Sequence, residues 1–420
     1  MIAWVQSILA RVAVTLILAL TIVASTLGSA LRGRKRARRA TLDSNGTAAG
    51  PVDVVMVGTF YNVGWFESHV MPLVASEAIR RVFVVCDAPL HSIDKVHYRT
   101  PGRLATRLLG RTLARFLTLV RVASTERPAM LLGYHIMPNA LLCLIAASWC
   151  GCKAAYQMTG GPIQIIGGGV GSENTLLRRQ LKPSRMRESL MQRVVRQFDW
   201  IIVRGQSAAE YVRSIGAGDR CLVVPGGVNT SRFSPNGRER AYDLIAVGRL
   251  VPVKRYDRML AIIAELKKSW PQVRLAIVGD GPLGESLRHQ AHSLGIADNV
   301  EFLGQREDVP HLLGQARVFI LTSENEGLSI AMLEAMAAGL PAIVPDIGDL
   351  RDVVREGETG CFINPDSPRK AADRIAHLLS DAGEMQALST AARSEAIQYA
   401  DVRSVADQWT ALIRAGGAAC

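Results

Sequence analysis

The sequence predicts an α/β protein built from two doubly wound parallel-sheet domains. Short runs of β-branched residues alternate with helical stretches, which is the pattern of parallel strands joined by crossover helices. The pattern stops at the polar segment 230–241 and then starts again, so it occurs twice. Each repeat spans about 180 residues, an ordinary size for one domain. A composition of 49% hydrophobic and 20% charged residues excludes a disordered chain and a coiled coil.

In the first half, short apolar runs mark the expected strands, and loops or helical stretches separate them. The expected strands are Val52–Val57, Val82–Val85, Met130–Leu132, Ala154–Tyr156, Trp200–Val203 and Leu222–Val224. Helical segments are expected over Ser68–Arg80 and from near Ser207. Parallel sheets bind ligands at the carboxyl ends of their strands, so the residues that directly follow these runs are candidates for a site.

The second half repeats this organisation. The expected strands are Asp243–Val247, Arg274–Val278, Val300–Phe302, Val318–Leu321 and Ala342–Val344. Helices are expected near Tyr256–Ser269 and over Leu328–Ala338. We therefore place one domain at 52–228 and another at 229–400. A C-terminal helix is expected over 401–420, and packing of this helix on the first domain is left open. The cleft between two such domains is the default ligand site.

The first 39 residues resemble a membrane anchor followed by a polybasic stretch. Val12–Leu31 is a run of 20 residues without a charge, long enough to cross a bilayer as a helix. Six cations follow it: Arg32, Arg34, Lys35, Arg36, Arg38 and Arg39. This asymmetry predicts a single-pass protein of the inner or plasma membrane with its later domains in the cytoplasm. A helix lying in the interface and a signal peptide or unused upstream start remain open, and 40–51 reads as a flexible linker.

The net charge of +12 is unevenly distributed. Residues 1–240 hold 31 basic and 13 acidic side chains, whereas residues 241–420 hold 18 basic and 24 acidic ones. Without an aromatic stacking platform or a known binding motif, this charge does not indicate nucleic acid. Four arginines recur at every fourth position: Arg103, Arg107, Arg111 and Arg115. Together with the basic stretch 178–196 they indicate either contact with an anionic membrane surface or a solvated helix face.

Two glutamates carry the most informative spacing. Glu326 and Glu334 are eight residues apart, and we expect both on a helix that starts around Gly327. They would then lie about 12 Å apart along the axis, too far to share a metal but suited to hydroxyls at two ends of an extended polyol. The alternative is one carboxylate at a helix start and one solvated glutamate.

Residues after the first two strands of the second half suit a phosphorylated ligand. Gly248-Arg249 follows the first of these strands, and Lys254 comes five residues after Arg249. A guanidinium fork and an ammonium in one strand-to-helix loop suit a diphosphate, although surface charge is the plain alternative. The segment with Asp280 and Gly281 ends the next strand, and its glycines allow close approach of backbone to a ligand.

Together these residues resemble the family 4 (group 1) glycosyltransferases, which are retaining enzymes of the GT-B fold. The resemblance covers roughly residues 52–400 and is strongest over 222–365. In this family, two glutamates are separated by seven residues, and Glu326 and Glu334 match this pattern. The resemblance implies the GT-B arrangement of two Rossmann-like domains, the first facing the acceptor and the second binding the nucleotide sugar.

The resemblance also implies roles for single residues. Arg249 and Lys254 would hold the donor diphosphate, Glu326 the donor sugar hydroxyls and Glu334 the ribose, with the base near Gly304–Asp308. The remaining residues that it assigns to donor binding are Gly248, Asp280, Gly281, Gly327 and Leu328.

The acceptor side matches the family less well. Gly64 precedes Glu67 where the family often has paired glycines before a Glu. His135 lies where the family often places a His at a strand end, and a purely structural role for it stays open. Gly160 and Gly161, in a glycine-rich loop, complete the candidate acceptor residues.

The implied function is retaining transfer of a hexosyl group from a nucleoside diphosphate sugar to a lipid-linked or polysaccharide acceptor at the cytoplasmic membrane face. UDP is the commoner donor base in the family, and GDP is its main rival. The chain has no Asp-x-Asp pair, so no metal is expected, and no cofactor is expected because the nucleotide sugar is a substrate. Two alternatives remain: a catalytically silent GT-B scaffold of polysaccharide assembly and a nucleotide-sugar epimerase.

Overall fold

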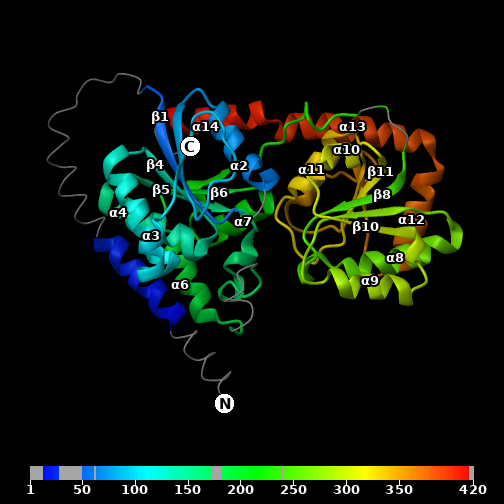
Figure 1. The fold of residues 1–420 in the computed structure, drawn as a ribbon, viewed down its shortest axis with the longest axis horizontal. Helices are drawn as coiled ribbons and strands as arrows, with labels where there is room; N and C mark the ends of the chain where they lie inside the picture. Colours follow the sequence, from blue (N-terminus) through cyan, green and yellow to red (C-terminus); the bar gives the residue numbers. More distant parts are fainter. Residues whose placement is uncertain are drawn as a thin grey trace, which may run out of the picture. The chain divides into compact units, whose positions relative to one another are not determined.

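The chain forms two compact units (Figure 1). The structure, a computed structural model, describes residues 13–27, 50–60, 63–172, 181–235, 237 and 240–415. The first unit takes in the chain up to Pro225 together with the residues from Val405 on. The second unit is Gly226–Ser404.

The first unit contains a wholly parallel sheet. Its described strands are β1 (Val52–Val57), β2 (Ile79–Val85), β3 (Val96–Arg99), β4 (Met130–Tyr134), β5 (Lys153–Met158), β6 (Trp200–Val203) and β7 (Cys221–Val223). Their order is β3-β2-β1-β4-β5-β6-β7. The chain therefore proceeds outward from β1 in one direction and then returns to add β4 on the other side. The point between β1 and β4 is where such sheets place a ligand, outside the carboxyl ends of the strands.

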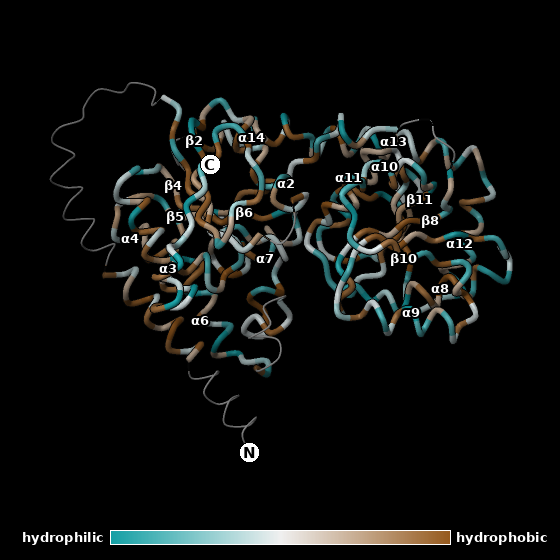
Figure 2. The backbone as a smooth tube through the Cα atoms, viewed as in Figure 1, coloured by the Kyte–Doolittle hydropathy of each residue, from teal (hydrophilic) through white to brown (hydrophobic). Residues whose placement is uncertain are grey.

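Helices and short turns cover this sheet. They are α2 (Val63–Ala75), α3 (Arg103–Glu126), α4 (Leu141–Cys150), α6 (Arg185–Val195), α7 (Gln206–Ser214), α14 (Val402–Arg414), and the short turns η1 (Ile136–Ala140), η2 (Pro162–Gln164), η3 (Ile166–Gly168) and η4 (Gly218–Arg220). Side chains alternate along each strand, so Val55 enters one core layer and Val54 the other. Trp409 of α14 packs into the second layer with Val54, which ties the end of the chain to the first unit. The apolar strands stand out in Figure 2.

Residues 13–27 are helical, and one stripe of this helix packs against the first unit. Val14 and Leu18 are buried in the same core layer as Val55, and Ser25 donates a hydrogen bond to Gln197. The remaining residues of the predicted anchor, and the basic run after it, lie outside the described residues. Within the described part of the chain no helix is long and apolar enough to cross a membrane, so the predicted spanning helix lacks support.

The second unit repeats the topology of the first. Its described strands are β8 (Tyr242–Val247), β9 (Leu275–Val278), β10 (Val300–Gly304), β11 (Ala316–Ile320), β12 (Ala342–Val344) and β13 (Gly360–Phe362). Their order is β10-β9-β8-β11-β12-β13, and all recorded pairings are parallel. The switch point here lies between β8 and β11. Two Rossmann-like parallel-sheet domains are therefore confirmed.

The helices of the second unit bury two further core layers. They are α8 (Tyr256–Ser269), α9 (Gly284–Ser293), α10 (Val309–Leu313), α11 (Ile330–Ala337), α12 (Pro368–Ser380), α13 (Ala382–Ala400), and the short turns η5 (Pro252–Lys254), η6 (Ala297–Asn299) and η7 (Gly348–Asp352). On β11, Phe319 enters one layer while Val318 enters the other. This alternation on both faces explains the continuous apolar runs in the sequence, because a parallel sheet is buried on both sides.

The first crossover differs from its prediction. The helix is α2, Val63–Ala75, rather than Ser68–Arg80, and Arg80 lies in β2. The polar start of β2 resembles a helix end in sequence, but Arg80 and Arg81 are held in the strand by a shared partner, Asp53 of β1. Strand pairing thus overrides the local pattern at this point.

Asp53 is a buried anion held by two arginines. Its side chain is 2% exposed, and it accepts hydrogen bonds at 2.8 Å from Arg80 Nη2 and 2.6 Å from Arg81 Nη2. Burial alone would raise the pKa of Asp53, but the two guanidinium bonds outweigh it and lower the pKa from 3.8 to about 2. Asp53 therefore stays charged and ties β1 to β2.

Replacing Asp53 with Asn should destabilise the first unit by about 1–2 kcal/mol near neutral pH, a value reduced by solvent screening at the exposed Arg80. Because the folded pKa is depressed, the stabilisation is present above pH 3.8 and disappears as pH falls toward about 2. Urea unfolding at neutral and acidic pH measures this difference. The exposed Asp94→Asn control should change stability by less than about 0.5 kcal/mol. Equal effects of both substitutions would contradict the role assigned to Asp53.

Candidate functional site

Three loops meet at the carboxyl edge of the second sheet. The loops after β8 and β9 are joined by backbone hydrogen bonds from Gly248 to Val278 (2.9 Å) and from Leu250 to Asp280 (3.0 Å). The loop after β11 joins them through a bond of 2.8 Å from the Glu324 N–H to the Val253 carbonyl. The sheet order makes this possible because β9, β8 and β11 are neighbours. The edge is therefore a fixed platform of connected loops.

Lys254 and Glu326 meet across the switch point of this sheet. Lys254 follows β8, Glu326 follows β11, and Lys254 Nζ lies 2.6 Å from Glu326 Oε1. Ser323 Oγ donates to the same oxygen at 2.6 Å. The Lys254 and Glu326 side chains are 19% and 10% exposed, so both reach solvent from a largely enclosed position. One contact uses one of the three donors of an ammonium, and an anionic ligand can take the others.

Arg249 lies on the same loop as Lys254. Two consecutive turns shape this loop: the Val251 N–H donates to the Arg249 carbonyl (2.9 Å), and the Lys254 N–H to the Val251 carbonyl (3.0 Å). Arg249 is exposed. One short loop thus carries a guanidinium and an ammonium, a combination suited to the spread charge of a diphosphate.

The two glycines after β9 are required by the packing of neighbouring loops, which could not be seen in the sequence. A Cβ on Gly279 would lie 2.0 Å from the carbonyl oxygen of Gly248, and one on Gly281 would lie 2.5 Å from that of Leu250. Both glycines therefore let the β9 loop lie directly on the β8 loop, rather than opening space for a ligand. Asp280 between them is exposed and accepts a hydrogen bond from the Gly281 N–H at 2.7 Å.

Glu326 and Glu334 do not share a helix, which corrects the prediction. Helix α11 begins at Ile330, and Ser329 caps it by accepting a hydrogen bond from the Met332 N–H. This cap places Glu326 in the preceding loop and Glu334, half-buried, within the helix. The 12 Å separation expected for one helix therefore does not apply.

The residues after Glu326 are also more enclosed than expected. Gly327 is buried, and Leu328, 5% exposed, packs in a core layer of the second unit. The Glu326 peptide is held from the β12 side, because a Cβ on Gly348 would lie 2.0 Å from the Glu326 carbonyl oxygen. Gly348 also has a φ of +55°, which favours glycine.

The segment Gly304–Asp308, where the base is expected, ends β10. Gly304 accepts a hydrogen bond from the Gly279 N–H at 2.7 Å, which joins this segment to the β9 loop. Arg306 donates to both carboxylate oxygens of Asp308, from Nε and Nη2, at 2.8 Å each. The segment is thus ordered beside the other loops by its own ion pair.

In the first unit, His135 is the centre of a polar and aromatic cluster. It follows β4 directly and has a φ of 60°, a conformation that is uncommon outside glycine. Trp65 of α2 stacks on it with ring centroids 6.0 Å apart and planes at 7°. Trp65 comes from the connection after β1, so this contact crosses the switch point between β1 and β4.

Gln164 selects one tautomer of the His135 ring. The Gln164 carbonyl oxygen accepts from the Tyr156 hydroxyl at 2.7 Å, which leaves its amide nitrogen facing His135 Nδ1 at 3.0 Å. The amide nitrogen can only donate, so Nδ1 accepts, and the neutral ring carries its proton on Nε2. Gly160 provides room for this bridge, since a Cβ there would lie 2.8 Å from Gln164 Nε2, and Gly161 opens the following turn with a φ of 70°.

A second histidine lies beneath this cluster. His69 Nδ1 lies 2.6 Å from the Trp65 carbonyl, and Arg204 donates to His69 Nε2. Burial, followed by the positive charge of Arg204, holds the pKa of His69 well below its usual value. His69 is therefore a neutral support under Trp65. The sequence did not single it out; its one available signal was Arg204, directly after the strand β6.

Glu67 and Gly64 take other positions on α2. Glu67 pairs with His91, with Oε1 and Nε2 3.2 Å apart. Gly64 is exposed in the first turn of the helix. Of the candidate acceptor residues, the structure thus gathers His135, Gly160 and Gly161 in one cluster and pairs Glu67 with a different histidine.

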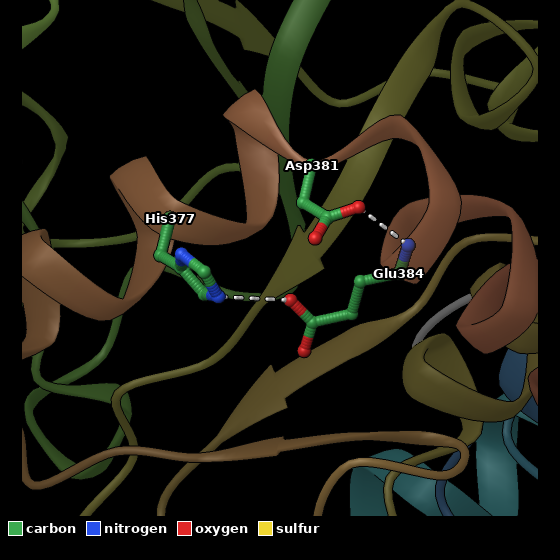
Figure 3. Close-up of side chains that lie close together, drawn as sticks. All are labelled: His377, Asp381 and Glu384. Atoms are coloured by element: carbon green, nitrogen blue, oxygen red, sulfur yellow. Dashed lines mark hydrogen bonds and ion pairs between the residues drawn. The ribbon is translucent and has the colours of Figure 1, made fainter.

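One group of potential metal ligands occurs in the part of the chain that the structure describes. His377, Asp381 and Glu384 lie together where α12 gives way to α13 (Figure 3). Glu384 already pairs with Arg374 at 2.6 Å, and Asp381 caps α13 by accepting from the Glu384 N–H at 2.8 Å. These bonds account for both carboxylates as structural groups.

Comparison with known proteins points to one family. Residues 228–395 match the family model described as "Glycosyl transferases group 1". The GDP-mannose-dependent alpha-(1-6)-phosphatidylinositol monomannoside mannosyltransferase of Mycobacterium tuberculosis is 31% identical over 211 residues, 46% of this chain and 55% of that protein. The D-inositol 3-phosphate glycosyltransferase of Salinispora tropica is 30% identical over 215 residues, 45% of each chain. The chain spans about half the length of these curated relatives.

The fold resembles solved structures over most of the chain. Anabaena Alr3699/HepE, solved in complex with UDP and glucose, superimposes with a TM-score of 0.69 and 18% sequence identity. The match covers 86% of this chain and 99% of that one. At this identity the likeness concerns the fold, which is that of GT-B glycosyltransferases.

Two glycine substitutions test how the Glu326 loop is held. Gly348→Ala should lower the free energy of unfolding by about 3 kcal/mol. The new methyl group would clash with the Glu326 carbonyl, and alanine is also disfavoured at a positive φ. Gly357→Ala is the matched control, since Gly357 has a φ of +70° and open space around its Cβ position. It should cost only about 1 kcal/mol. Urea unfolding measures both, and equal losses would contradict the close contact.

Proposed function

We propose that this chain, whose residues 228–395 belong to the glycosyl transferases of group 1, moves a hexosyl group from a nucleoside diphosphate sugar to a hydroxyl acceptor. The observation that carries the proposal is the meeting of Lys254 and Glu326 at the switch point of the second sheet, with Arg249 on the adjoining turn. This position is where doubly wound sheets bind phosphorylated ligands.

The proposed chemistry depends on the departure of the diphosphate. Negative charge grows on the leaving group as the sugar–phosphate bond breaks. Arg249 and Lys254 supply fixed positive charge on a loop already ordered by its turns, so little reorganisation is needed when that charge appears. Glu326, which accepts from both Lys254 and Ser323, orients the ammonium and leaves its second oxygen, Oε2, for a donor sugar hydroxyl.

We further propose retention of configuration, which the family resemblance implies. The acceptor hydroxyl attacks on the face from which the diphosphate leaves, and the diphosphate takes the acceptor's proton. This route needs no protein nucleophile and no general base beside the anomeric carbon. Lys254 then acts by holding the phosphate oxygens that receive the proton.

The donor base has two candidates. UDP is the commoner family donor, and the structural neighbour was solved with UDP and glucose. The mycobacterial relative, which is more similar in sequence, is named for GDP-mannose. We therefore treat UDP-glucose and GDP-mannose as the two arms of one experiment.

The proposed acceptor is a glycolipid or lipid-linked saccharide at the cytoplasmic membrane face. The mycobacterial relative is named for a phosphatidylinositol monomannoside acceptor, which is a lipid. The excess of basic residues in the first half of this chain also favours work at an anionic surface.

A thermal-shift screen tests donor binding. At a donor concentration about one hundred times its Kd, binding stabilises the protein by about 2.7 kcal/mol, which should raise the Tm by roughly 5 °C. One of the two nucleotide sugars should produce this shift, and the other a smaller one. The absence of any shift would contradict the proposal and favour a catalytically silent scaffold. Conversion of the donor sugar to its epimer without acceptor would favour an epimerase.

Lys254→Ala should lower turnover by at least about a hundredfold, because it removes a charge aimed at the leaving group. Lys268→Ala is the matched control, since Lys268 pairs with Glu265 on the exposed face of α8. Single-turnover rates with the donor found by the screen measure the effect, and far-ultraviolet circular dichroism confirms that both variants fold. Wild-type rates for Lys254→Ala would contradict the assignment.

A further inference from the structure

In the part of the chain that the structure describes, the first part of α3 is a largely exposed helix face. At Gly110 the backbone leaves the helical conformation (φ 76°, ψ 160°), which separates a short N-terminal part from the rest of the helix. Every residue from 107 to 113 is exposed, whereas Ala114, Leu119 and Val122 beyond the break are buried in the core. The N-terminal part therefore extends from the first unit rather than contributing to its core.

Large apolar side chains lie on this uncovered part. Leu104 and Leu108, one helical turn apart, are 70% and 72% exposed. Further exposed leucines of α3 are Leu109, Leu113 and Leu117. Singly exposed leucines are ordinary on a soluble protein, but a group of them on one short segment marks a surface that meets an apolar partner.

Arginines alternate with these leucines. Arg103, Arg107 and Arg111 are exposed, and residues 95–125 contain no Asp or Glu. The fourth arginine of the predicted stripe, Arg115, belongs to the interior instead: its side chain is 6% exposed and pairs with Asp87 at 2.7 Å. The exposed segment thus carries only positive charge. A second copy of this chain would bring arginine against arginine here, whereas an anionic surface would complement the charge.

A hollow and a tryptophan adjoin the same segment. A cavity of about 420 Å³ opens beside the break in α3, lined by Leu109, Leu113 and Phe116 of α3 and by Leu142 and Ile145 of α4, together with Gly110, Arg111 and Thr112. Trp149 of α4 is 55% exposed, and its ring lies against Phe116 with centroids 5.8 Å apart. Exposed tryptophans with one apolar face are typical of the boundary between lipid and water.

We propose that the exposed side chains of residues 103–113 together with Leu117, here called the α3 face, bind the surface of an anionic lipid bilayer. The leucines enter the boundary between headgroups and acyl chains, the arginines contact lipid phosphates, and the hollow beside Gly110 accommodates part of an acyl chain. This surface would bring the first unit to a lipid-linked acceptor. Only this last step, the reason for the membrane contact, rests on the proposed function.

The test is flotation of the full chain with vesicles of phosphatidylcholine, with and without phosphatidylserine. Wild-type protein should bind the anionic vesicles at least about tenfold more tightly, and added salt should weaken this binding. The Leu104→Glu/Leu108→Glu variant should lose at least about tenfold in binding to anionic vesicles. Leu294→Glu is the matched control, because Leu294 is exposed on the second unit, and it should bind as wild type.

A second variant probes the charge separately. Arg103→Gln and Arg107→Gln should each weaken binding to anionic vesicles by about fivefold and leave binding to neutral vesicles unchanged. Wild-type affinity in the double-glutamate variant would overturn the proposal and assign membrane contact to another segment. The proposal would also be overturned if the wild-type chain bound no vesicles. The same holds if light scattering showed a dimer that the leucine substitutions dissociate, because the α3 face would then join two copies of the chain. Donor-induced thermal shifts should be the same in all variants, which separates this proposal from that of donor binding.

Discussion

The contact between Lys254 and Glu326 is the interaction on which the functional account depends. These residues are 72 positions apart in sequence, yet their charged atoms lie 2.6 Å from one another. They meet because the chain first builds β8, β9 and β10 in one direction and then returns to place β11 against the other side of β8. Only this return brings the loop after β11 onto the loop after β8. The strand order therefore creates the site, and the packing of Gly279 and Gly348 against neighbouring carbonyls fixes its loops in place.

The first unit uses the same strand order for a different surface. Its switch point lies between β1 and β4, and Trp65 and His135 meet there as stacked rings instead of an ion pair. The His135 cluster is neutral and aromatic, with Gln164 setting the tautomer, whereas the Lys254 cluster is charged. This difference agrees with the proposed division, in which the first unit would receive a sugar or lipid hydroxyl and the second would hold the diphosphate.

Most strands of both sheets lie close to their predicted positions, because parallel strands buried on both faces form apolar runs in the sequence. The strands β6 and β12 and the helix α8 have the predicted bounds. The strands β3 and β13 were missed, since β3 lies at a sheet edge with half-buried residues and β13 begins with a glycine and contains no β-branched residue. The pairing of Lys254 with Glu326 could not be deduced from spacing, because it depends on the sheet order. The start of α11 was also predicted too early: Ser329 caps this helix, so Glu326 lies in the loop before it. The glycines around Asp280 were recognised, but Gly279 and Gly281 pack against backbone carbonyls rather than opening space for a ligand.

A crystal structure of the full chain with bound nucleoside diphosphate shows most directly whether Arg249 and Lys254 hold the donor diphosphate. We expect the diphosphate at the carboxyl edge of the second sheet, with phosphate oxygens within hydrogen-bond distance of Lys254 Nζ and the Arg249 guanidinium, and the ribose beside Glu334. A nucleotide bound elsewhere, with Lys254 and Glu326 still paired and no phosphate near either cation, would contradict it.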